Sequence, residues 1–197
     1  MQFVIHRQKE IKDANERQEQ KWLRDVGCFE ASSFVEVVNA TNSSYNRMFQ
    51  YKIVNRITAT NKYLRMINVK ESENCTFCNA EPETIAHLFW YCPITKEFIT
   101  AMKTELLNKY NVSVSVNLKT WLFPTDLPAR ETLIFTLAKI AIYRARCKNS
   151  TPHITHLMNM LKQEIETESK VAELLGKQNN VQEKWGALRH INTYIGI

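Results

Sequence analysis

The spacing of apolar residues predicts a chain made mostly of helices. Over residues 44–58, large apolar side chains recur at helical spacing (Met48, Phe49, Ile53, Val54 and Ile57). Lys52 and Arg56 fall four residues apart on another face of the same helix. We therefore expect an amphipathic helix that is buried on one side and cationic on the other.

Further helices are predicted where capping residues meet apolar runs. Thr60 or Asn61 can cap a short helix, and Pro93 suits the first turn of a long one. A strongly apolar run begins after Pro128, and a last long helix begins near Pro152. The expected bounds of these helices are about 60–67, 93–109, 128–147 and 152–175.

Three other segments give weaker patterns. Residues 7–26 are highly charged, which predicts an exposed helix with few apolar anchors (Ile11, Trp22, Leu23 and Val26). Residues 34–38 fit either a short strand or the start of a helix. Residues 111–117 alternate as NVSVSVN, which is strand-like but isolated.

Composition supports a helical, globular protein. Glycine (four residues) and proline (five) are scarce, which favours long helices over a turn-rich β fold. There is no apolar run of about eighteen residues, and the first residues turn polar after Ile5, so we expect neither a transmembrane helix nor a signal peptide. The expected protein is intracellular and has no membrane partner.

The chain divides into three expected segments. Residues 1–44 are predicted to be a charged helical linker or extension, and residues 45–110 a small domain with flanking helices. Residues 111–197 are predicted to be a helical extension packed on that domain.

Positive charge is concentrated in two stretches that contain no acidic residue. The net charge of the chain is +6. One stretch lies between Val37 and Lys70 and contains Arg47, Lys52, Arg56, Lys62, Arg65 and Lys70. The other lies between Thr132 and Gln163 and contains Lys139, Arg144, Arg146, Lys148 and Lys162. Such charge either attracts phosphate backbones or forms an ordinary solvated surface, and charge alone favours neither.

Four potential metal ligands lie within eighteen residues. Cys75 and Cys78 have the spacing of a zinc knuckle, and His87 and Cys92 follow. Three thiolates and one imidazole form a closed tetrahedral Zn²⁺ site that leaves no position for water. In a helix over 84–91, which Thr84 could cap, His87 and the residue four positions on would share a face. We expect one structural zinc ion, and a mainly α fold built around this Cys-Cys-His-Cys knuckle with minor β structure at most.

The cluster also has a less favoured interpretation, and the other cysteine and histidine residues show weaker patterns. In that interpretation, the four residues are buried side chains of a helical core. Cys28 and Cys147 are expected to be ordinary buried thiols. His153 and His156 lack a third ligand nearby, so surface or capping roles are favoured.

These motifs resemble those of a known family. Residues 49–61, the Cys75-x2-Cys78 pair and the phrase ETIAHLFWYC over 83–92 are similar to the zinc-binding segment that follows the polymerase domain in LINE-type non-LTR retrotransposon reverse transcriptases. Residues 137–152 are similar to the helix and turn that follow the motif in vertebrate-type members. The resemblance covers about 45–185.

The resemblance implies a non-catalytic module that binds RNA or DNA and assists target-primed reverse transcription. The chain has no polymerase-type Asp-Asp pair and no constellation suited to an endonuclease, so no enzyme activity is expected of it. Phosphate contacts are predicted for seven cations (Lys52, Arg56, Lys62, Arg65, Arg144, Arg146 and Lys148). Phe77 or Tyr91 could stack on bases, although core packing is favoured for each.

Two other functions remain open. The zinc domain could be a scaffold that docks on the polymerase domain through the apolar helices at 128–147 and 152–175, and packing of the cationic helix against acidic residues 164–173 would favour this. A hydrolytic zinc enzyme ranks lowest, because catalytic zinc needs an open coordination position. From the family's chemistry, the expected location is the nucleus and cytoplasm.

Overall fold

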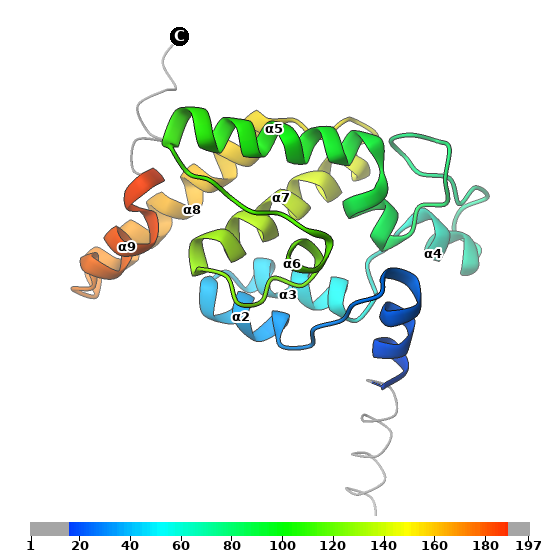
Figure 1. The fold of residues 1–197 in the computed structure, drawn as a ribbon, viewed down its shortest axis with the longest axis horizontal. Helices are drawn as coiled ribbons and strands as arrows, with labels where there is room; N and C mark the ends of the chain where they lie inside the picture. Colours follow the sequence, from blue (N-terminus) through cyan, green and yellow to red (C-terminus); the bar gives the residue numbers. More distant parts are fainter. Residues whose placement is uncertain (1–15, 189–197) are drawn as a thin grey trace, which may run out of the picture.

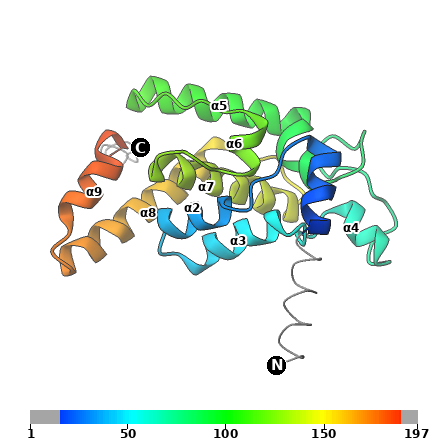
Figure 2. The same cartoon turned by 60° about the horizontal axis from the view of Figure 1, so that its bottom comes forward.

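A computed structural model describes residues 16–188, and every regular element within this range is a helix (Figures 1 and 2). The β structure in this range is a single antiparallel bridge between Asn74 and Pro82. The predicted fold class, mainly α with minor β at most, is therefore confirmed.

The central element is helix α7 (Ala129–Cys147), which is buried around most of its circumference. It packs against α2 (Ser33–Ala40), α3 (Ser44–Val54), α8 (Ile154–Leu174) and α9 (Gln178–Trp185). A helix that is apolar on nearly all sides is stable only when other helices surround it. Although α7 and α8 are long, no helix in residues 16–188 is both long and apolar enough to cross a membrane.

The remaining elements cover the other side of α7 and the end that carries the cysteines. Figures 1 and 2 show α5 (Pro93–Tyr110) along one edge of the molecule and α2 and α3 along the opposite edge, with α7 between them. The short helix α6 (Leu118–Leu122) and the π-helical turn η1 (His87–Tyr91) contact each other. Helix α4 (Asn61–Met66) lies beside the loop over residues 74–82 that carries Cys75 and Cys78, hereafter the cysteine loop, and away from α8 and α9 (Figure 1).

One hydrophobic core joins residues from all three expected segments. It includes Trp22 and Phe49 from the amino-terminal half and Trp185 from α9. Residues 16–26 are helical as predicted, but this helix is well anchored because Trp22 is fully buried and its indole N–H donates to the carbonyl of Val54 at 2.8 Å. The expected anchor Ile11 lies outside the described residues.

Helix α3 ends earlier than predicted, and this changes the place of Arg56. The helix stops at Val54 instead of continuing to residue 58. Arg56 adopts a left-handed backbone conformation with φ of 57°, and the N–H of Ile57 donates to the carbonyl of Lys52 at 2.9 Å. This arrangement closes the last turn of a helix. Arg56 therefore does not extend the cationic face of α3.

Two weak patterns have a simple explanation in the structure. Residues 34–38 lie inside α2, so the helical interpretation is correct. Residues 111–117 run extended without a partner strand in the described range, with Val112 and Val114 buried and the intervening serine exposed. The alternation therefore reflects an extended segment packed on the core.

Candidate metal centre

The structure brings the four predicted ligands together. One ligand atom each from Cys75, Cys78, His87 and Cys92 lies within 4.8 Å of all the others. The Sγ atoms of Cys75 and Cys92 are 3.9 Å apart, and Cys78 Sγ lies 3.3 Å from His87 Nε2. Zn–S and Zn–N bonds of ordinary length give tetrahedral edges of about 3.8 Å and about 3.6 Å. The donor types and their separations therefore fit one tetrahedral zinc ion.

The first ligand pair is held by a tight backbone turn. The N–H of Cys75 donates to Glu81 at 2.8 Å, and the N–H of Asn79 donates back to the carbonyl of Cys75 at 2.9 Å. Asn79 has φ of 54°, a conformation that asparagine tolerates better than most residues. The N–H of Phe77 points at Cys75 Sγ at 3.4 Å and would stabilise a thiolate there.

The second ligand pair depends on a π-helical turn. His87 and Cys92 are five positions apart, whereas an α-helix places residues four apart on one face. The N–H of Cys92 donates to the carbonyl of His87 at 2.8 Å, which closes an i to i+5 turn. The expectation of an aligned pair is correct, but the α-helical reason for it is wrong. In an α-helix the half-exposed Tyr91 would take the place of Cys92.

Side chains support the π-helical turn and the residues that lead into it. The hydroxyl of Thr84 accepts a hydrogen bond from the N–H of His87 at 2.9 Å, so Thr84 caps, as predicted, the helical stretch that begins at residue 85 and leads into the turn. The carbonyl of Phe89 accepts from the indole N–H of Trp121 at 2.6 Å, and that of Leu88 from the hydroxyl of Thr95 at 2.7 Å. These bonds stabilise carbonyls inside the core that would otherwise lack a donor.

The electrostatics favour a thiolate at Cys92. A hydrogen bond from the Cys75 thiol lowers the pKa of Cys92 to about 5, with further help from the N–H groups of Thr95 and Ile94 at the start of α5. The pKa of Cys75 is raised, because it donates that hydrogen bond and is buried. A zinc ion would replace the shared proton and hold both sulfurs as thiolates. With four ligands in place, the ion would have a structural role and no open position for water.

A buried polar network fixes the knuckle to the rest of the fold. The Glu83 carboxylate is fully buried and accepts from the N–H groups of Asn61 (2.9 Å) and Thr76 (2.8 Å). It also pairs with Arg146 at 2.9 Å. Asn61 in turn accepts from Arg146 at 2.6 Å and from Lys70 at 2.9 Å. The carboxylate thus joins the start of α4, the cysteine loop and the end of α7.

Of the seven predicted phosphate contacts, the one at Arg146 is therefore wrong and the one at Arg56 is weakened. Arg146 is buried and its guanidinium is committed to Glu83 and Asn61, so it cannot reach a phosphate backbone. Arg56 pairs with Asp25 and stacks over the Trp22 ring with 4.4 Å to its centroid. Positive charge in a sequence gives the sign of a segment, but it does not say which cations face inward.

The other five predicted contacts are exposed. Lys62 and Arg65 lie on α4 beside the cysteine loop, and Lys52 lies on α3. Arg144 and Lys148 lie at the carboxyl end of α7. None of these five forms an ion pair within residues 16–188.

The other cysteine, histidine and aromatic residues considered from the sequence also divide into buried and exposed side chains. Cys28 is half-buried, but Cys147 is exposed, so the expectation that Cys147 is buried is wrong. His153 caps α8 as expected, its ring accepting from the N–H of Thr155 at 3.3 Å. Phe77 packs against the core, whereas Tyr91 is 43% exposed and remains available for stacking.

Lys139 is an inward-facing cation that the sequence pattern did not reveal. It is fully buried on α7 and donates to Gln50 Oε1 at 2.8 Å. Burial lowers the pKa of Lys139 to about 7. Its position among apolar residues of the run after Pro128 was the available signal, since a lysine there must enter the core with its helix.

Comparison with known proteins agrees with this site. Residues 34–98, roughly a third of the chain, match a family model described as zinc-binding in reverse transcriptase. The match confirms, over these residues, the predicted resemblance to reverse-transcriptase zinc-binding segments, and all four ligands lie within it. Neither the curated proteins nor the solved structures yielded a match. The LINE-type assignment stays a prediction.

Proposed function

We propose that the chain is a non-catalytic module of a LINE-type retrotransposon reverse transcriptase that binds single-stranded RNA or DNA and assists target-primed reverse transcription. One structural zinc ion would hold the cysteine loop against α4 and α7. The module would bind phosphates through cations on α3, α4 and the end of α7. Its partners would be the nucleic acid and the polymerase domain of the same protein.

The observation that carries this proposal is the set of five exposed cations without an acidic partner in the described range (Lys52, Lys62, Arg65, Arg144 and Lys148). A cation already paired with a carboxylate gains little from a phosphate, whereas an unpaired cation releases counterions when it binds. The family match supports the same proposal, because its description places the segment in an enzyme that copies nucleic acid.

Fluorescence anisotropy with labelled single-stranded RNA and DNA tests the proposal. The logarithm of the association constant should fall linearly with the logarithm of salt concentration, by about 0.7 per phosphate contact. Replacing Lys62 and Arg65 with alanine should lower the magnitude of this slope by about 1.4 for the pair. Affinity should change little between sequences.

Two exposed lysines with acidic partners give a matched control. Lys109 pairs with Glu105 at 2.7 Å, and Lys119 pairs with Glu30 at 2.8 Å. The double change Lys109→Ala and Lys119→Ala removes the same charge, and it should leave the slope nearly unchanged. Equal losses in the two double variants would mean that only net charge matters and that these helices form no binding site.

The scaffold hypothesis has less support. The apolar side chains of α7 lie inside the core, so that helix has little surface on which to dock a partner. Within residues 16–188, Glu164 accepts hydrogen bonds from Thr41 and Asn46, and Glu168 pairs with Lys184. Neither carboxylate pairs with a cation of α3, so the packing that would favour the scaffold hypothesis is not seen for these two residues.

A further inference from the structure

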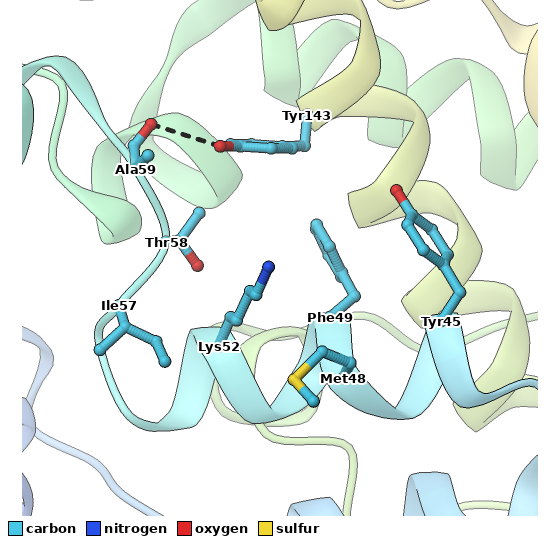
Figure 3. A pocket seen from close by; sticks show the side chains of 8 residues that line it. All are labelled: Tyr45, Met48, Phe49, Lys52, Ile57, Thr58, Ala59 and Tyr143. Atoms are coloured by element: carbon cyan, nitrogen blue, oxygen red, sulfur yellow. Dashed lines mark hydrogen bonds between the residues drawn. The ribbon is translucent and has the colours of Figure 1, made fainter.

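An aromatic pocket lies between α3 and the segment over 57–59, with a volume of about 160 Å³ (Figure 3). Phe49 of α3 and Tyr143 of α7 line it, with their ring centroids 5.8 Å apart. The Tyr143 hydroxyl donates to the carbonyl of Ala59 at 3.4 Å. Figure 3 shows this bond across one end of the pocket, so Tyr143 helps to position the 57–59 segment.

The size and rim of the pocket suit one planar ring that enters from solvent. A cavity of about 150 Å³ in another protein holds a single benzene ring. Tyr45, Met48 and Ile57 also line the pocket, and each is about half exposed. Met48 and Ile57 were predicted to lie on the buried side of α3, so this face is more open than the sequence pattern indicates.

A buried polar atom in the pocket lacks a partner. Thr58 is 3% exposed, and its hydroxyl oxygen has no hydrogen-bond partner within the described residues. Figure 3 shows this oxygen turned toward the space that the Lys52 amino group also enters. Buried hydroxyl groups nearly always have a partner, because an unpaired one is costly. The missing partner points to a ligand with a polar edge.

The charge around the pocket is positive. Lys52 lines it, and the Arg144 guanidinium lies over the Tyr45 ring with 5.3 Å to the ring centroid. Within residues 16–188, no acidic side chain lines the pocket. Aromatic rings beside unpaired cations are the combination with which proteins bind single-stranded nucleic acid. An aliphatic side chain of a protein partner would fill the space but leave Thr58 unpaired.

We propose that this pocket binds one unpaired base of single-stranded RNA or DNA, with Lys52 and Arg144 holding the adjacent phosphates. The base would pack against the rings of Phe49, Tyr143 and Tyr45, and its polar edge would pair with Thr58. This inference rests on the proposed function and deepens it, because it names where a base, and not only the phosphate backbone, is bound.

Binding to oligo(U) RNA, to oligo(dT) DNA and to an abasic strand of the same length tests the inference in the wild-type chain. Tyr45→Ala should weaken binding to the base-bearing strands about tenfold, and Thr58→Val about fivefold. Neither change removes charge, so the salt dependence should stay the same. Tyr51→Ala is the matched control, since Tyr51 is a similarly exposed tyrosine of α3 that does not line the pocket.

The outcomes separate this inference from the proposed function. A loss confined to base-bearing strands, for RNA, DNA or both, supports the pocket as a base site and identifies the preferred strand. If the wild-type chain binds base-bearing and abasic strands equally and both pocket variants match Tyr51→Ala, the inference is overturned while the proposed function stands. If the wild-type chain binds no strand in a salt-dependent way, both are overturned.

Discussion

Replacing Arg146 tests whether this cation has a structural role instead of the predicted contact with nucleic acid. The change Arg146→Met keeps much of the side-chain volume but leaves the fully buried Glu83 carboxylate without its cation. Removing one partner of a buried ion pair costs about 3–5 kcal/mol. Glu83 keeps the N–H donors of Asn61 and Thr76, so we expect the lower end, about 3 kcal/mol.

Urea denaturation of the zinc-loaded chain, followed by circular dichroism, measures this cost. Arg144→Met is the matched control, because Arg144 lies on the same helix, is exposed and contacts the Tyr45 ring. It should change the free energy of unfolding by about 0.5 kcal/mol or less. Under conditions in which both variants are folded, the salt dependence of RNA and DNA binding should be lower for Arg144→Met and unchanged for Arg146→Met.

The opposite pattern would refute the reasoning. If Arg146→Met were as stable as Arg144→Met and had the lower salt dependence, the guanidinium would face solvent and the predicted phosphate contact would be right. The network around Glu83 would then not hold the knuckle to α7.

Two further predictions concern buried groups. Lys139 binds its proton less tightly in the folded chain (pKa about 7) than unfolded (10.5), so its deprotonation favours folding, and stability should rise by about 2 kcal/mol between pH 7 and 9. Urea titrations at both pH values should show this rise in the wild type and its loss in Lys139→Met, and an equal rise in both would contradict the assignment. Trp121→Phe leaves the Phe89 carbonyl unpaired, which should cost about 1–3 kcal/mol and weaken zinc binding in a chelator competition. Trp185→Phe is the control, because it removes an indole hydrogen bond to Glu168 that lies away from the knuckle, and its zinc affinity should match that of the wild type. Equal zinc affinities in the wild type, Trp121→Phe and Trp185→Phe would contradict a role for Trp121.

Much of the fold could be predicted from the sequence because long apolar runs and capping residues leave few alternatives. The run after Pro128 forms the central helix α7, and Pro93 begins α5 as expected. The end of α3 could not be predicted, because the left-handed residue there is Arg56 and not the glycine or asparagine that usually marks a helix end.

The ligand set of the metal site could also be predicted, but the backbone that aligns it could not. Ligand types and spacing identify Cys75, Cys78, His87 and Cys92, and the structure brings them together. A π-helical turn contains one more residue than an α-helical turn, and no residue type marks it in a sequence. The only sign of it here is the five-residue separation of His87 and Cys92. The partners of Arg146 lie more than sixty residues away, at Glu83 and Asn61, so local charge patterns cannot reveal them.

The zinc content of the purified chain tests the central claim most directly. Elemental analysis should give one zinc ion per wild-type chain, with loss of the ion and of cooperative unfolding in His87→Ala and Cys92→Ser. Cys147→Ser is the matched control, since Cys147 is an exposed cysteine outside the cluster, and this variant should keep the ion. A wild-type chain that folds cooperatively without zinc, or a Cys92→Ser variant that keeps the ion as Cys147→Ser does, would contradict the proposed metal centre.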